Sequence, residues 1–173
     1  MRLRSEQGFG LIELLMAMVM LNIGILAVVA AFNSGIFALN RASRITTASA
    51  LADSQMERFR ALTYAAIALD TSSLAGADNT YKCDSALGGS CPNSTSGEIT
   101  NTCSGSPLPN ECLPSRTVTG ADRKNYRVDT YITSSTPTGG RALKIVTVVV
   151  RDGSKLSARP LARVASTFDQ STG

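Results

Sequence analysis

The sequence predicts an α+β protein, in which a long N-terminal helix packs on a small antiparallel β-sheet and a disulfide-stapled loop lies between them. Three observations lead to this prediction. A long apolar run near the N-terminus continues into a helical pattern, four cysteines lie in a polar middle segment, and apolar and polar residues alternate in the last third. The chain of 173 residues leaves room for one small domain beyond the helix.

The apolar run contains no charged residue between Leu14 and Asn40. About 20 apolar residues cross a bilayer as a helix, so we expect residues 9–37 to form a transmembrane helix. One carboxylate, Glu13, lies near the start of this run. A charge within the hydrocarbon costs about 2.5–3.5 kcal/mol on insertion scales, so Glu13 is a candidate functional residue. The alternative is a glutamate at the level of the lipid headgroups.

The helix is expected to continue beyond the membrane over residues 38–69, because no proline occurs between Leu11 and Leu69. Apolar side chains recur there at the spacings of three and four that are typical of an amphipathic helix. They are Ile45, Ala48, Ala52, Met56 and Phe59. This apolar stripe needs a partner, and the downstream sheet is the natural one. Arg41 and Arg44 interrupt the stripe locally, and we interpret them as anchors at the headgroup level.

The middle segment, residues 70–120, is rich in Ser, Thr, Gly, Asn and Pro, and it predicts a loop region rather than a part of the core. It holds all four cysteines, which are Cys83, Cys91, Cys103 and Cys112. Their spacing lacks CxxC pairs and the chain has no histidine, so two disulfides are favoured over a zinc site. Disulfides require an oxidising compartment. Of the three possible connectivities, we favour Cys83–Cys91 with Cys103–Cys112, because both close short loops.

The last part of the chain, residues 121–173, predicts an antiparallel sheet. Apolar and polar residues alternate from Tyr126 to Thr133, and the run from Ala142 to Arg151 has the strongest β-propensity in the chain. The Asp-Gly pair that follows it is typical of a type I′ hairpin, which predicts a return strand over Lys155–Phe168. Residues Thr117–Thr119 are expected to add a short strand.

The composition argues against catalysis. Without histidine there can be no Ser-His-Asp triad, no Cys-His pair and no histidine-based metal site, and no phosphate-binding glycine motif is present. The net charge of +4 is mildly basic and is not by itself a nucleic-acid signature. We therefore predict no enzyme activity, no catalytic residue, no metal site and no cofactor.

The segment Gly8-Phe9-Gly10-Leu11-Ile12-Glu13 resembles the class III signal of type IV pilins and type II secretion pseudopilins. The resemblance implies that residues 1–8 are a leader, that prepilin peptidase cuts after Gly8, and that Phe9 is then N-methylated. Glu13 becomes the fifth residue of the mature chain, where it pairs with the amine of Phe9 in a neighbouring subunit. The alternatives are an ordinary secretory signal cut near Val29-Ala30-Ala31 and a plain membrane anchor.

Within this family, residues 13–18 followed by residues 21–24 are most similar to PilV-type minor pilins and the related minor pseudopilins. The resemblance implies a structural filament subunit that begins as a single-pass protein of the bacterial cytoplasmic membrane, with an exported C-terminal domain, and later lies in a pilus at the cell surface. Its implied partners are prepilin peptidase, other pilins or pseudopilins, the inner-membrane assembly platform and, before assembly, membrane lipid.

Two further functions remain open at this point. One is a minor pseudopilin of type II secretion, and the other is a pilus-tip module that binds a surface or DNA. Positive charge in or near the cysteine loop comes from Lys82, Arg116, Arg123, Lys124 and Arg127. Tyr81 is the only aromatic residue near that loop before Tyr126, which makes a poor stacking platform for single-stranded DNA.

Overall fold

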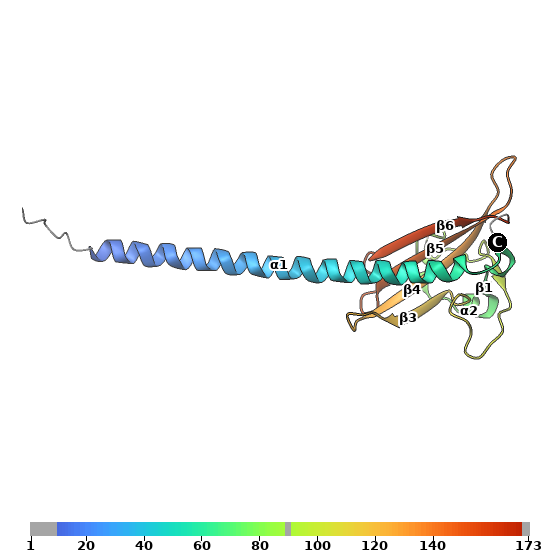
Figure 1. Ribbon diagram of the computed structural model, residues 1–173, viewed down its shortest axis with the longest axis horizontal. Coiled ribbons are helices and arrows are strands. Elements are labelled where there is room, and N and C mark those ends of the chain that lie inside the picture. Colours follow the sequence, from blue (N-terminus) through green and yellow to red (C-terminus); the bar gives the residue numbers. More distant parts are fainter. Residues whose placement is uncertain (1–9, 89–90, 171–173) are drawn as a thin grey trace, which may run out of the picture. The chain divides into compact units, whose positions relative to one another are not determined.

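The computed structural model describes residues 10–88 and 91–170 and divides into two compact units, residues 1–42 and residues 43–173 (Figure 1). A single helix, α1 (Leu11–Arg60), begins in the first unit and ends in the second. In the first unit, the large apolar side chains of α1 are between 49% and 84% exposed. By length and composition this helix can cross a membrane. So much exposed apolar surface requires lipid or other protein around it.

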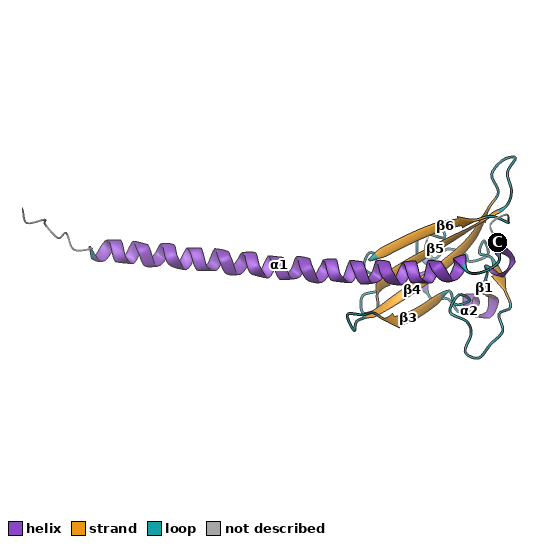
Figure 2. Ribbon diagram, viewed as in Figure 1, coloured by secondary structure: helices purple, strands orange, loops and turns teal. Residues whose placement is uncertain are grey.

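The second unit is built on a four-stranded antiparallel sheet (Figure 2). Its strands are β3 (Ser115–Thr119), β4 (Asn125–Ser135), β5 (Leu143–Asp152) and β6 (Ala162–Phe168), in the spatial order β3-β4-β5-β6. The long β-branched run of the sequence forms β5, which pairs with β4 along its whole length. This arrangement confirms the predicted α+β fold, with β3 beginning two residues before the predicted short strand.

One face of the sheet packs against the C-terminal part of α1. Ala48, Ala52, Met56 and Phe59 are at most 1% exposed and lie in one hydrophobic cluster with the strand residues Val128, Ile132, Val146, Val148 and Val150. The register places Val128 opposite Val150 and Ile132 opposite Val146, so these strand residues share a face. Ile45, the first residue of the predicted stripe, is still 39% exposed. Arg44 was expected at the headgroup level, but it forms an ion pair with Asp152 at 2.7 Å.

The opposite face of the sheet is covered by residues 71–112, which we call the cover. The cover includes α2 (Thr71–Ala75) and α3 (Asn79–Lys82), and a two-residue parallel pairing joins β1 (Leu69–Asp70) to β2 (Thr100–Asn101). Its Tyr81 is fully buried and stacks on Tyr131 of β4, with 4.3 Å between ring centroids. The prediction that this segment lies outside the core was therefore wrong.

Helix α1 ends at Arg60, nine residues before the predicted end at Leu69. A short 3₁₀ turn, η1 (Tyr64–Ala66), follows it, and the chain from Ile67 to Asp70 is buried without interruption. Continuous burial does not suit a surface helix. The backbone carbonyls here have partners elsewhere, because the Lys144 ammonium donates to the oxygens of Tyr64 and Ile67 at 2.7 and 2.8 Å. Tertiary contacts therefore override helix propensity.

The predicted type I′ hairpin after β5 does not form. The chain makes a turn at Gly153, but β6 begins only at Ala162, so the expected return strand from Lys155 was too long. Gly153 has no positive φ and donates its backbone N–H to the Asn125 oxygen at 2.9 Å. A Cβ at this position would lie 2.8 Å from that same oxygen, so the glycine permits a close approach of two backbones rather than a left-handed turn.

Candidate functional site

The processing residues Gly8 and Phe9 lie outside the described residues, but Glu13 is within them. Glu13 lies in the first turn of α1, where its backbone N–H donates to the Gly10 oxygen at 3.0 Å. Its side chain is exposed. A carboxylate at this end of a helix is favoured by the helix dipole. The helix therefore begins at Leu11, two residues before the glutamate that the sequence singled out for assembly.

Glu13 has no cationic partner along its own helix. The next basic residue after it is Arg41, 28 positions further on, which corresponds to about 42 Å of α-helix. In a hydrocarbon environment, a carboxylate is stable only when it is protonated or paired with a cation. A partner for Glu13 within the membrane must therefore come from the N-terminal end of this chain or from another molecule.

The four cysteines form the two disulfides Cys83–Cys91 and Cys103–Cys112. Both lie in the cover, and two hydrogen bonds tie the second one to Asp70 at the end of β1. The Asp70 N–H donates to the Cys112 oxygen at 2.8 Å, and the Cys103 N–H donates to an oxygen of the Asp70 carboxylate at 3.2 Å. The disulfides thus hold a segment that is poor in large aliphatic residues in a fixed shape, which is the role expected of cross-links in such a segment.

Charged contacts fasten the cover to the sheet. Arg127 of β4 donates to Asp78 at 2.7 Å and to Asp129 at 2.7 Å. Asp84, which is 2% exposed, accepts from Arg151 of β5 and from Arg163 of β6. Hydrogen bonding from Arg127 lowers the pKa of Asp78 to about 2. The cover is therefore held by ion pairs as well as by the stacked tyrosines.

These contacts engage part of the positive charge that the sequence places near the cysteine loop. The Arg127 side chain is only 9% exposed and is engaged by two carboxylates, so it does not present charge to a ligand. Arg116 donates to the Gln55 side chain at 3.0 Å. Of the five basic residues considered from the sequence, these two are structural contacts. The cover's acidic residues Asp78 and Asp84 were not predicted as contacts, because strands β4, β5 and β6 carry one arginine each and no local pattern pairs them with the cover.

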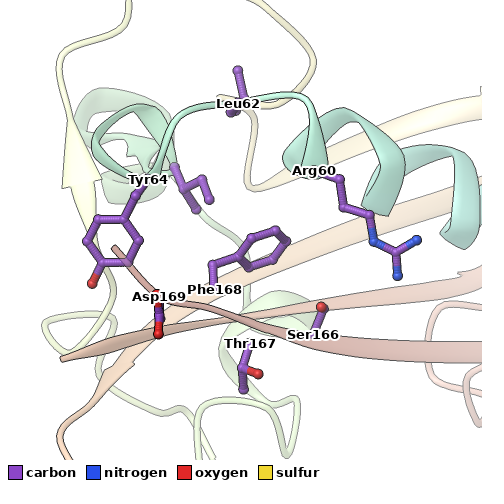
Figure 3. A pocket seen from close by; sticks show the side chains of 8 residues that line it. Arg60, Leu62, Tyr64, Ser166, Thr167, Phe168 and Asp169 are labelled. Atoms are coloured by element: carbon purple, nitrogen blue, oxygen red, sulfur yellow. The ribbon is translucent and has the colours of Figure 1, made fainter. Parts of the chain in front are cut away.

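A cavity of about 290 Å³ lies between the end of α1 and strand β6 (Figure 3). Figure 3 shows the side chains of Arg60, Tyr64 and Phe168 around it. Two of its polar side chains have partners, because Arg60 is paired with Glu57 at 2.5 Å and the Tyr64 hydroxyl donates to the Ala142 oxygen at 3.0 Å. Among the described residues, no group of three His, Cys, Asp or Glu side chains could hold a metal ion. The cavity therefore gives no indication of a ligand.

Comparison with known proteins bears on the N-terminal segment. Residues 3–29 match the family described as the prokaryotic N-terminal methylation motif. The chain carries a class III signal. This signal is typical of type IV pilins and pseudopilins, and it implies processing by prepilin peptidase and assembly with other pilins. With its long helix packed on a four-stranded antiparallel sheet, the chain has a pilin-like fold. No curated protein and no solved structure matched it.

Proposed function

We propose that this pilin-like chain is a minor subunit of a type IV pilus or a related filament. The observation that carries the proposal is the first part of α1, an exposed apolar helix with one carboxylate near its start, directly behind a prepilin-type cleavage sequence. Before assembly the helix lies in lipid, and in the filament it packs against the helices of neighbouring subunits. The transfer exchanges one apolar environment for another and does not expose the helix to water.

The role proposed for Glu13 follows from its lack of a cation along its own helix. Cleavage after Gly8 would create an amine at Phe9, four positions before Glu13. In this mechanism the amine that pairs with Glu13 belongs to a neighbouring subunit, and the charge pair sets the register between two otherwise apolar helices. An ion pair that is buried and well defined favours one arrangement over many similar ones. The inner-membrane assembly platform would bring the two subunits together.

The assignment as a minor subunit rests on two features of the sequence. The apolar segment after Glu13 is similar to that of PilV-type minor pilins, and both disulfides lie in the middle of the chain rather than near its C-terminus. A minor pseudopilin of type II secretion shares the cleavage signal and differs in the machine that it serves. The neighbouring genes would distinguish these two assignments.

The proposal is tested by intact-mass spectrometry of the native protein extracted from membranes, with and without reductant. We expect a chain that begins at N-methylated Phe9 and gains the mass of four hydrogens on reduction. A chain that keeps Met1, or one cut near Ala31, would contradict the proposal. Gly8→Ala provides the matched variant, because it should keep the leader and accumulate in the membrane.

A further inference from the structure

We propose that Glu98 is a proton-dependent latch, which holds the cover on the sheet while its carboxyl is protonated and releases it when the proton is lost. Glu98 lies in the cover, 8% exposed, and forms a bridge to Thr133 of β4. The Ile99 N–H beside it donates to the Ile132 oxygen at 2.8 Å. Loss of this contact would separate the cover from the C-terminal half of β4.

The number of hydrogens at Tyr81 indicates that Glu98 is protonated. The Tyr81 hydroxyl oxygen lies 2.6 Å from Oε1 of Glu98 and 2.7 Å from the Thr130 carbonyl oxygen. A phenol has one hydrogen to donate, and a backbone carbonyl can only accept. Both contacts are hydrogen bonds only if Glu98 donates to the Tyr81 oxygen while Tyr81 donates to Thr130. An ionised Glu98 would leave one of the two acceptors without its hydrogen.

The second carboxyl oxygen of Glu98 supports the same protonation state. Oε2 is buried and has no hydrogen-bond partner among the described residues. An orphaned oxygen is far more costly on a carboxylate than on a neutral acid. Burial raises the pKa of Glu98 to about 7.

The charged groups around this site do not offset ionisation of Glu98. On the same face of β4 as Tyr131, Asp129 is fully buried, and its negative charge raises the pKa of Tyr81. The basic groups on this face are Arg127, Arg151 and Arg163, and the carboxylates Asp129, Asp78 and Asp84 engage them. Tyr131 completes the surroundings through its stacking on Tyr81. Ionisation would therefore add a further buried negative charge beside arginines that already have carboxylate partners.

The sign of the pH dependence follows from where the proton binds more tightly. The pKa of Glu98 rises from 4.5 when exposed to about 7 when the cover is closed. The closed form therefore holds the proton more strongly, and opening becomes easier as the pH rises from 4.5 to 7. The opening equilibrium constant should increase tenfold per pH unit over this window, about 300-fold in total, and stay constant above it.

The test uses the full chain in detergent micelles with both disulfides intact. Carbon-13 NMR of the glutamate carboxyls should give a titration midpoint near 7 for Glu98. Hydrogen exchange at the Ile99 amide, corrected for the intrinsic rate, should show the predicted increase in opening. Glu98→Gln should abolish the pH dependence, because a neutral amide donates to Tyr81 at every pH. Glu111→Gln, which removes a half-exposed carboxyl of the cover, should keep the wild-type profile.

Two results would contradict the proposal, and both can be measured. A Glu98 midpoint near 4.5, or an Ile99 profile with the same slope in wild type and Glu98→Gln, would overturn the latch. If Glu98→Gln does not fold, the NMR midpoint of the wild-type carboxyl decides alone. The inference concerns the second unit only, so its failure leaves the proposed processing at Gly8 and Phe9 unaffected.

Discussion

Removal of the Asp84 carboxylate should be among the most damaging single changes in the second unit. Asp84 is 2% exposed and accepts from two guanidinium groups, those of Arg151 and Arg163. Breaking a buried ion pair by removing one partner costs about 3–5 kcal/mol. Arg163 is 36% exposed and can rehydrate, whereas Arg151 is 10% exposed and keeps a 3.6 Å contact with Asp129 and a 3.3 Å hydrogen bond to the Ala158 oxygen. We therefore expect Asp84→Ala to lower the free energy of unfolding by about 3 kcal/mol.

The assay is urea-induced unfolding of the full chain in mild detergent, monitored by the near-ultraviolet circular dichroism of tyrosine. All four tyrosines lie in the second unit and the chain has no tryptophan, so the signal reports this unit alone. Asp53→Ala is the control, because Asp53 is exposed on α1 and its loss should change the unfolding free energy by less than about 0.5 kcal/mol. An Asp84→Ala variant within about 1 kcal/mol of wild type would refute the reasoning.

Three other changes test separate parts of the molecule. Glu13→Gln should leave cleavage and methylation intact by mass spectrometry, yet reduce incorporation into filaments by about tenfold or more, since a charge pair worth over 1.4 kcal/mol is lost. Gly120→Ala should cost about 1–3 kcal/mol in unfolding free energy, because its Cβ would lie 2.7 Å from side chains of α1 and β4. Gly97→Ala is the control and should be neutral, because a Cβ at residue 97 would meet no atom within 4 Å. The Asp78–Arg127 pair should stabilise the fold above pH 3.8 and lose that contribution as the pH falls towards 2. Acid titration should therefore show that Arg127→Ala loses less unfolding free energy over this pH range than the wild type does.

The elements that were predicted well share strong periodicity. The apolar run of α1, its stripe from Ala48 to Phe59 and the β-branched run of β5 each repeat one pattern over many residues. Such patterns report which face is buried, and burial was enough to predict the layers. The N-terminal signal was equally accessible, because it is a short local sequence that matches the methylation motif over residues 3–29.

The elements that were missed depend on partners distant in the sequence. Nothing local ends α1 at Arg60, since the next residues take their partners from β5 through Lys144. The Asp152-Gly153 pair indicates a tight hairpin turn from its sequence alone. Only the structure shows that the Asn125 backbone lies against Gly153. Tyr81 and Glu98 looked like parts of a polar loop, and only their position against β4 shows that they are buried.

The composition of the cover also explains why ion pairs, rather than apolar packing alone, join it to the sheet. Buried ion pairs contribute little net stability compared with apolar packing, but they penalise wrong arrangements heavily. A polar segment with few large aliphatic side chains could otherwise slide along the sheet at little cost. Asp84 must meet Arg151 at a buried site, and the partly exposed Asp78 must meet the buried Arg127, so together the two pairs favour one register. The disulfides limit how far the segment can move, and the ion pairs determine where it docks. Glu98 then lies in a docking surface whose register is already fixed, so its proton can change the strength of docking without changing its position.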